Sequence, residues 1–273
     1  DNSGGVDASD HEVNIKILLG DVVENGDMTL KQRNTLLEQM TDEVAALVLR
    51  GNYQQSQAIS VMAAQAGDLL DRHARFMRGL ERTGQLDRAI EFLPDEEAIQ
   101  ERKERGCGLT RPEIAVLLSY GKIALYRELL ASDLPDDPQL LNDLHRYFPK
   151  ALGKRYEPLL ERHRLPREIV ATHVVNSMVS RVGAHFVLDL ETRTGASGSD
   201  VARAYAVTRE IFRLREVWGR IEALDNQIPA ALQTRMLIEI GQLVERSTMW
   251  FLKTGDRPLD LAGTIAEYAP GIE

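Results

Sequence analysis

The sequence predicts an all-α fold, and three observations support this prediction. Apolar residues recur at intervals of three and four, as they do along one side of an amphipathic helix. Helix-start signals precede several of these stretches. One such signal is Ser or Thr followed three residues later by Glu or Gln, and the other is a proline. No stretch after Val6 alternates apolar and polar residues between turn signals, as a strand would. The clearest helical stripe is formed by Leu36, Leu37, Met40, Val44, Leu47 and Val48.

Composition limits the class of protein. Of the 273 residues, 43% are hydrophobic and 27% are charged, which is usual for a folded protein of one or two domains. The net charge of −9 argues against a nucleic-acid-binding surface. Apolar runs such as Ile114–Leu118 are too short to span a membrane. A single cysteine, Cys107, excludes an internal disulfide and fits the cytoplasmic location that we expect.

The first half of the chain contains several helix signals. Ser9 with Glu12 has the spacing of a capping box, so a helix is expected to begin near Asp10. Thr29 with Gln32 is a second such pair. A loop is expected over Gly20–Met28 because it contains turn residues and few anchors. The expected helices cover Asp10–Leu19, Thr29–Arg50 with an end at Gly51-Asn52, Tyr53–Ala66, Leu69–Thr83, a segment starting at Pro94, and Arg111–Ser132.

The second half is expected to contain three long helices. Before these long helices, prolines at 149 and 158 divide the chain into short helices. Brief polar turns join the long helices, with Ser199 or Asp200 as the cap of the second, so we expect them to pack antiparallel as a bundle. A last short helix follows Pro258. The three long helices are expected over Arg167–Thr194, Val201–Asp225 and Pro229–Lys253.

Two breaks in this pattern suggest domain boundaries. The first follows the opening helix, and the second lies at Gly106–Leu109, where a Gly-x-Gly interrupts the helices without a preceding strand. The expected division is therefore residues 1–27, then a helical subdomain over 28–108, then a helical bundle domain over 109–273.

Catalytic signatures are absent after Glu12. The sequence has no P-loop, no Gly-x-Ser-x-Gly and no His-Glu-x-x-His. His73 and His145 are expected in mixed polar surroundings, whereas His173 and His185 are expected in the core or an interface. Neither His73 nor His145 has a Cys, Asp or His at metal-ligand helical spacing, and His173 and His185 are twelve residues apart, too far to share an ion. We therefore assign no catalytic residue and no metal site to this chain.

The opening segment is the one stretch whose residues suggest a binding site. Asn2-Ser3-Gly4-Gly5 is a turn-rich run, and paired glycines allow positive φ angles and close backbone approach. A glycine turn that leads into a helix N-terminus can hold an anion, because free N–H groups and the helix dipole point to the same place. An ordinary capped helix after a tight turn explains the same spacing.

The segment Asn2–Glu12 resembles the Asn-x-Gly-Gly-Val-x-x-Ser-x-x-Glu signature of glutamate dehydrogenases. With its continuation to Leu19 it is similar in particular to the large bacterial NAD-specific members of that family. The resemblance implies that Asn2 lies beside the nicotinamide end of NAD. It also implies that Ser9 helps to hold the side-chain carboxylate of glutamate and that Val6 lines the same pocket.

Later motifs resemble the C-terminal helical region of the same enzymes, and the resemblance covers nearly the whole chain. Ser3, Ala8 and Cys107 stand where family members vary. The catalytic lysines, the acid/base Asp and the nucleotide fold of the family are missing, and are expected upstream of Asp1. The similar motifs are Gly108–Leu117, His163–Thr172, Asp200–Val207, Trp218, Ile221–Asp225 and Trp250-Phe251.

Two functions are therefore considered. In the first, the chain is the C-terminal part of an NAD-dependent glutamate dehydrogenase that converts L-glutamate to 2-oxoglutarate and ammonia. The opening residues would then be a Gly-rich turn left over from an α/β cofactor domain. The helical body would brace the upstream catalytic domain or join subunits of a homo-oligomer. In the second, the chain is a free-standing acidic helical module that binds partner helices and catalyses nothing.

Overall fold

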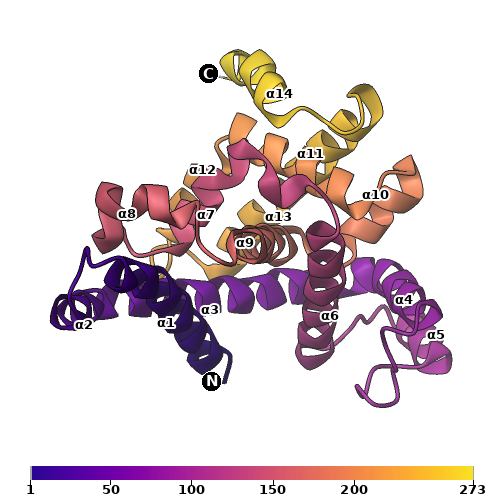
Figure 1. The fold of residues 1–273 in the computed structure, drawn as a ribbon. Coiled ribbons are helices and arrows are strands. Elements are labelled where there is room, and N and C mark those ends of the chain that lie inside the picture. Colours follow the sequence, from indigo (N-terminus) through magenta and orange to yellow (C-terminus); the bar gives the residue numbers. More distant parts are fainter. Residues whose placement is uncertain (1, 273) are drawn as a thin grey trace. The chain divides into compact units, whose positions relative to one another are not determined.

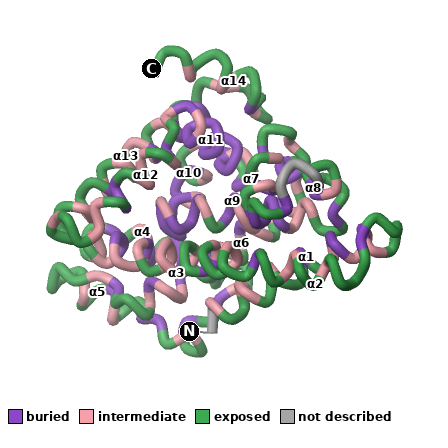
Figure 2. Tube along the Cα trace, turned by 90° about the vertical axis from the view of Figure 1, so that its left-hand side faces the viewer, coloured by how far each residue is buried: buried purple, intermediate pink, exposed green. Residues whose placement is uncertain are grey.

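The computed structural model describes residues 2–272, apart from the side chains of residues 2, 3 and 153–155. Helices dominate this part of the chain, and it contains no strand, which confirms the all-α prediction (Figure 1). Figure 2 shows buried and exposed residues alternating along most helices, as expected for amphipathic segments that each cover part of a core. The derivation of the first residues from an α/β cofactor domain stays a prediction.

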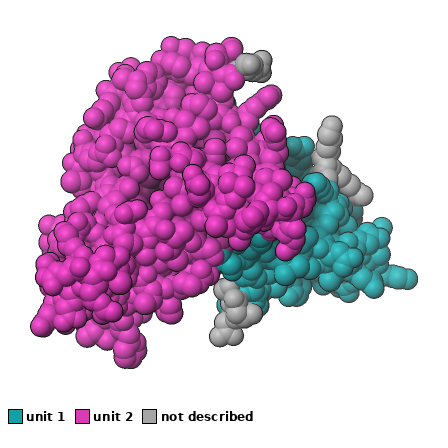
Figure 3. Space-filling view, turned by 180° about the vertical axis from the view of Figure 1, so that it is seen from behind, with its two compact units in different colours: residues 1–56, 135–174 teal, residues 57–134, 175–273 magenta. Residues whose placement is uncertain are grey.

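The chain forms two compact units (Figure 3). Unit 1 comprises residues 1–56 and 135–174, and unit 2 comprises residues 57–134 and 175–273. The chain passes from one unit to the other inside helices α3 (Thr41–Ala64) and α9 (Pro166–Val182) and near the short 3-10 turn η1 (Leu134–Asp136). The division into residues 1–27, 28–108 and 109–273 follows the order of the sequence signals and stays a prediction.

Unit 1 is organised on α1 and the start of α3. Buried residues Ile15, Leu18, Leu19 and Val22 recur along α1 at intervals of one, three and four, and so form its core-facing stripe. The elements of unit 1, besides the first part of α3 and of α9, are α1 (Asn2–Glu24), α2 (Leu30–Gln39), η2 (Pro138–Leu140), α7 (Leu141–Tyr147), η3 (Lys150–Leu152) and α8 (Gly153–Leu160).

Helix α1 begins at Asn2, so the predicted start near Asp10 is wrong. Ser9 is an exposed residue inside the helix and does not cap it. A close approach to α3 accompanies the early start: a Cβ on Gly4 would lie 2.9 Å from Nδ2 of Asn52. The predicted loop over Gly20–Met28 is also too long, because α1 continues to Glu24 and places Val22 in the core.

The helices that follow α1 divide at a different place from the one predicted. The capping box of Thr29 and Gln32 is confirmed, with the Thr29 N–H donating to Oε1 of Gln32 at 2.9 Å. The break then comes at Met40, which is buried between α2 and α3. The predicted end at Gly51-Asn52 is wrong. A Cβ on Gly51 would lie 3.6 Å from the Asp7 carboxylate, so this glycine lies inside α3 where α1 packs against it.

Unit 2 is built around α11 (Gly198–Ile211), which is buried along most of its length (Figure 2). Five helices of the unit pack against it: α6, α10, α12, α13 and α14. The elements of unit 2, besides α11 and the ends of α3 and α9, are α4 (Ala66–Arg82), α5 (Glu96–Glu104), α6 (Arg111–Leu130), α10 (Phe186–Thr194), α12 (Leu214–Glu222), α13 (Ala230–Thr254), α14 (Leu261–Tyr268) and η4 (Ala269–Gly271).

Local start signals in unit 2 agree with the sequence. The Thr110 N–H donates to the Glu113 carboxylate at 2.7 Å, which confirms the predicted capping box of α6. Asp95, next to the predicted start at Pro94, caps α5 by accepting the Ala98 N–H at 2.9 Å. The cap of α11 is Ser197, whereas Ser199 or Asp200 was expected.

Of the three long helices predicted, only α13 is unbroken. Gly183, with φ 87°, separates α9 from α10, and Arg213, with φ 48°, separates α11 from α12. A Cβ at position 183 would lie 2.7 Å from Sδ of Met62 and 3.0 Å from Cε1 of His185. The chain therefore turns at Gly183 because only glycine combines this φ with such close neighbours.

Replacing Gly183 with alanine is expected to destabilise the chain more than replacing Gly195. Both glycines have a left-handed backbone conformation, with φ of 87° and 67°. An added Cβ costs about 1–2 kcal/mol in that conformation. Only at position 183 would the Cβ also collide with other atoms. Urea denaturation of both variants tests this, and equal losses of unfolding free energy at the two positions would contradict it.

Candidate functional site

The exposed face of α1 carries the residues that the sequence singled out. Val6 and Ser9 are three residues apart, so helical geometry puts them on one face. Val6 is 67% exposed, Ser9 is exposed, and Val13, 51% exposed, continues the same stripe. The side chain of Asn2 lies outside the described residues. The structure therefore brings Val6 and Ser9 together on an uncovered helical surface.

The expected anion site at a helix N-terminus does not fall at Ser9. Ser9 lies inside α1, where backbone N–H groups donate to carbonyls of the preceding turn. Ser9 can therefore offer its exposed hydroxyl to a ligand, but not the N–H groups of a helix start. The capping box expected for Ser9 and Glu12 is also absent, because Ser9 does not begin the helix.

Hydrogen bonds beside the core-facing stripe also hold α1, at Asp10, one turn after Val6, and at Asn14. The Asn14 Nδ2 donates to the Tyr147 hydroxyl at 2.8 Å, and that hydroxyl donates to the Asp10 carboxylate at 2.6 Å. Burial and the hydrogen bond to Asp10 raise the pKa of Tyr147, which keeps its hydroxyl a proton donor. These bonds connect α1 to the end of α7.

Two histidines complete this attachment. Nδ1 of His163 accepts the Leu165 N–H at 3.1 Å, so Nε2 carries the ring proton and donates to the Asn14 carbonyl at 3.0 Å. The His11 ring stacks on Tyr147 with centroids 4.3 Å apart, and burial lowers the pKa of His11. The rotation of α1 about its axis is thereby fixed, and Val6 and Ser9 are kept facing outward.

Sequence reasoning did not find these positioning residues. Asn14 directly precedes the buried stripe that begins at Ile15, and is itself only 5% exposed. A polar side chain at a core position of a helix needs a buried partner. That position was the available signal, although the partner, Tyr147, could not be identified because it lies far away in the chain.

Replacing Tyr147 with phenylalanine should lower the free energy of unfolding by about 1–3 kcal/mol, because the Asn14 amide and the Asp10 carboxylate would each lose their bond to the hydroxyl. Tyr268→Phe is the matched control, since that ring lies at the surface and is partly exposed. Thermal or urea unfolding of both variants measures the difference. A Tyr147→Phe chain as stable as the Tyr268→Phe chain would show that the buried bonds do not anchor α1.

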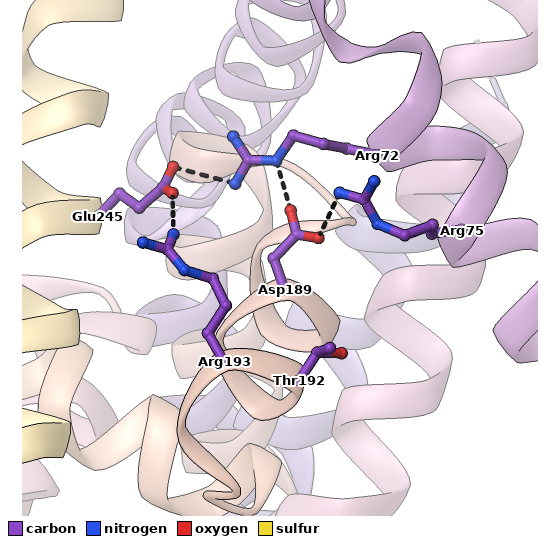
Figure 4. Close-up of a pocket in the computed structure, with 6 residues that line it drawn as sticks. All are labelled: Arg72, Arg75, Asp189, Thr192, Arg193 and Glu245. Carbon is purple, nitrogen blue, oxygen red and sulfur yellow. Dashed lines mark hydrogen bonds and ion pairs between the residues drawn. The ribbon is translucent and has the colours of Figure 1, made fainter.

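Unit 2 contains a charged cleft of about 380 Å³ between α4, α10 and α13 (Figure 4). Arg72 bonds both carboxylates of the cleft: its Nε donates to Asp189 and its Nη2 donates to Glu245 at 3.0 Å. Arg193 donates to Glu245 at 3.1 Å, and Arg75 donates to Asp189 at 3.3 Å. Each carboxylate thus accepts hydrogen bonds from two arginines, and these bonds connect α4, α10 and α13. The Thr192 hydroxyl, which also lines the cleft, donates to the Leu188 carbonyl of its own helix at 2.7 Å.

Two buried histidines lie beside this network. His73 and His185 pack edge to face with centroids 5.2 Å apart. Burial, and then the charge of Arg72, lower the pKa of His73 to about 4, and the same causes lower that of His185. His73 is 2% exposed but lies among polar groups, with Arg72 and Asp189 close to it, and the core position expected for His185 is confirmed.

An apolar cleft of about 670 Å³ lies on another side of α4, between α6 and α10. Gly79, Gly121 and Ala184 line it, and the helices approach closely there, since a Cβ on Gly121 would lie 2.8 Å from the Cβ of Ala184. Burial, and then repulsion by Glu128, raise the pKa of Glu191 at its edge to about 7. Glu191 can therefore exchange a proton near neutral pH.

His73 and Glu191 are expected to act on stability in opposite senses. His73 has a pKa of about 4 when folded and 6.5 when unfolded, so its contribution is complete above pH 6.5 and is lost toward pH 4. Glu191 has a raised folded pKa, so its contribution is present below pH 4.5 and is lost as the pH rises toward 7. Each pKa unit corresponds to about 1.4 kcal/mol.

Unfolding free energies measured between pH 4.5 and 7.5 separate the two groups. His73→Phe should make the loss of stability on acidification shallower, and Glu191→Gln should make it steeper. Only the slope is compared, because each substitution also shifts stability at every pH. Identical slopes in all three chains would exclude both contributions.

Neither a metal site nor a membrane span is visible in the described part of the chain. Its His, Cys, Asp and Glu side chains form no group of three that could hold a metal ion. None of its helices is long and apolar enough to cross a membrane.

Comparisons with known proteins cover both ends of the chain. The family model "Glutamate dehydrogenase, C-terminal" matches residues 106–273. The model "Bacterial NAD-glutamate dehydrogenase, catalytic domain" matches residues 1–62, which include the exposed face of α1.

Three relatives, each named NAD-specific glutamate dehydrogenase, match the chain from end to end. The relative from Pseudomonas aeruginosa is 48% identical over 272 residues, that from Halomonas elongata 47% over 274, and that from Mycobacterium tuberculosis 39% over 273. Each match covers 100% of this chain and 17% of the relative. The chain therefore spans about one sixth of the length of these proteins.

Proposed function

The chain belongs to the glutamate dehydrogenase family, and from this premise we propose that it is the C-terminal part of an NAD-specific glutamate dehydrogenase. The whole enzyme would oxidise L-glutamate by moving a hydride from its α-carbon to NAD. Water would then hydrolyse the resulting imine to 2-oxoglutarate and ammonia. The observation that carries this proposal is the match of residues 1–62 to a catalytic-domain model, at the segment that presents Val6 and Ser9 together.

The exposed face of α1 would complete the active site from its edge. The Ser9 hydroxyl can donate a hydrogen bond to the side-chain carboxylate of glutamate, and Val6 can cover the aliphatic part of the substrate. Asn2 would lie beside the nicotinamide. The anchors at Asn14 and His11 support this role because they fix which face of α1 points outward.

The residues of this chain fit only one end of NAD. The described residues form no strand to lead a Gly-x-Gly-x-x-Gly turn, and the stripe of Val6 and Ser9 contains no arginine that could pair with a pyrophosphate. The nucleotide fold, the catalytic lysines and the acid/base Asp would belong to the preceding part of the polypeptide. The helical body would brace that part or join subunits of a cytoplasmic homo-oligomer.

The family matches favour this proposal over a free-standing interaction module. They cover both the opening segment and the C-terminal helices, and the relatives share the whole chain. An independent module would need its own binding surface, but it would not need a catalytic-domain signature at its first residues.

Replacing Ser9 with alanine in the whole polypeptide should raise KM for glutamate about tenfold or more, since a hydrogen bond to a charged group contributes about 1.5–3 kcal/mol. KM for NAD should change little. Ser119→Ala is the matched control, because Ser119 is also an exposed helical serine and its hydroxyl bonds only its own helix, at the Ala115 carbonyl. Steady-state rates of NADH formation give both KM values for the unsubstituted enzyme, the Ser9→Ala variant and the Ser119→Ala variant. An unchanged KM for glutamate in the Ser9→Ala enzyme would exclude the assignment.

A further inference from the structure

The connection between α4 and α5 presents two large apolar side chains to solvent. It extends away from the neighbouring helices of unit 2 (Figure 1). Phe92 is 90% exposed and Ile90 is 70% exposed, and Phe92 is the most exposed large apolar side chain among the described residues. Burying one such side chain is worth about 1.5–3 kcal/mol, so leaving two in water on one turn is unfavourable unless they have a partner.

Buried contacts hold this connection in one shape. Leu86 and Leu93 are buried on either side of the exposed pair. The nearly buried guanidinium of Arg88 donates to the Pro94 carbonyl at 3.2 Å. It also donates to Glu81 at 2.7 Å and to Glu96 at 2.8 Å. The exposed side chains therefore stand on a fixed base and are not the tip of a loose loop.

The backbone at Phe92 turns its side chain outward. Phe92 has φ 53°, a left-handed conformation that is uncommon for a bulky residue and costs about 1–2 kcal/mol. The residue before it, Glu91, accepts the Tyr120 hydroxyl at 2.7 Å, and the residue after it, Leu93, enters the core. The chain thus tolerates strain in an arrangement that buries Leu93 and exposes Phe92.

The size of this surface indicates where its partner is. An aromatic side chain buries about 150–250 Å², whereas a stable association of two separate proteins needs about 800 Å² from each partner. Two side chains suffice only when the partner is tethered and its effective concentration is high. The relatives, of which this chain covers 17%, contain a large amount of such tethered chain.

We propose that Ile90 and Phe92 form a knob that inserts into an apolar recess on the preceding part of the same polypeptide. The inference rests on the proposed function, which makes this chain one part of a longer enzyme. The exposed carboxylates Asp87 and Glu97 precede and follow the knob along the chain, so the rim of the recess should be basic. The knob would fix the helical body to the part that carries the nucleotide fold.

Photo-crosslinking in the full-length polypeptide tests the knob. The probe is p-benzoyl-phenylalanine in place of Phe92, and the control is the same probe in place of Leu232, which is 46% exposed on α13 of the same unit. After irradiation, position 92 should give adducts of single-chain mass, at several times the control yield, with peptides that precede this chain. Adducts of two-chain mass, or a yield equal to that of the control, would overturn the proposal.

A second measurement keeps this test separate from the proposed function. Glutamate-dependent NADH formation is assayed in the unsubstituted full-length polypeptide. An active enzyme without the intramolecular adduct would overturn the knob and leave the proposed function intact. An inactive polypeptide with the adduct would support the knob and overturn the proposed function. Proteolysis gives a further check. In the full-length polypeptide, the double variant Ile90→Ser, Phe92→Ser should be cut by protease between the helical body and the preceding part several times faster than the Leu232→Ser variant.

Discussion

Helix α11 is buried along most of its length, because five helices of unit 2 pack around it. Ala202, Ala204 and Ala206 let those neighbours approach closely, and Tyr205 fills the larger space between them. Such a position requires every polar group on the helix to have a partner. Arg203 reaches Asp133 at 2.7 Å, and the Arg209 guanidinium lies 6.0 Å from the Tyr205 ring and pairs with Glu210.

Around this central helix, the chain also breaks two of the long helices that the sequence predicted. Helices that wrap around a core element must change direction, and the chain does so where a left-handed residue allows it, at Gly183 and Arg213. A buried ion pair then fixes the pieces: Arg181 lies 2.8 Å from Glu222 and stacks 4.7 Å from the Trp218 ring. Removing one partner of such a pair is far more damaging than replacing both, because a lone buried charge would remain.

The two surfaces with a proposed role share a principle of construction. In each, exposed apolar or hydroxyl groups face outward because buried polar contacts hold the backbone from behind. Asn14 and Tyr147 do this for the face of α1, and the Arg88 guanidinium does it for the knob. A hydrophobic contact alone has no direction, whereas hydrogen bonds fix rotation and register, which a substrate edge or a docking contact requires.

The sequence by itself determined the all-α class, the capping boxes at Thr29 and Thr110, and the family signature of the opening segment, because each depends on residues a few positions apart. Only the tertiary structure decided that α3 runs through Gly51, that the chain turns at Gly183, and that Phe92 stays in water. Whether a helix continues past a glycine depends on what packs against it, and those atoms come from distant parts of the chain. The sequence could therefore name Val6 and Ser9, but their shared outward face required the fold.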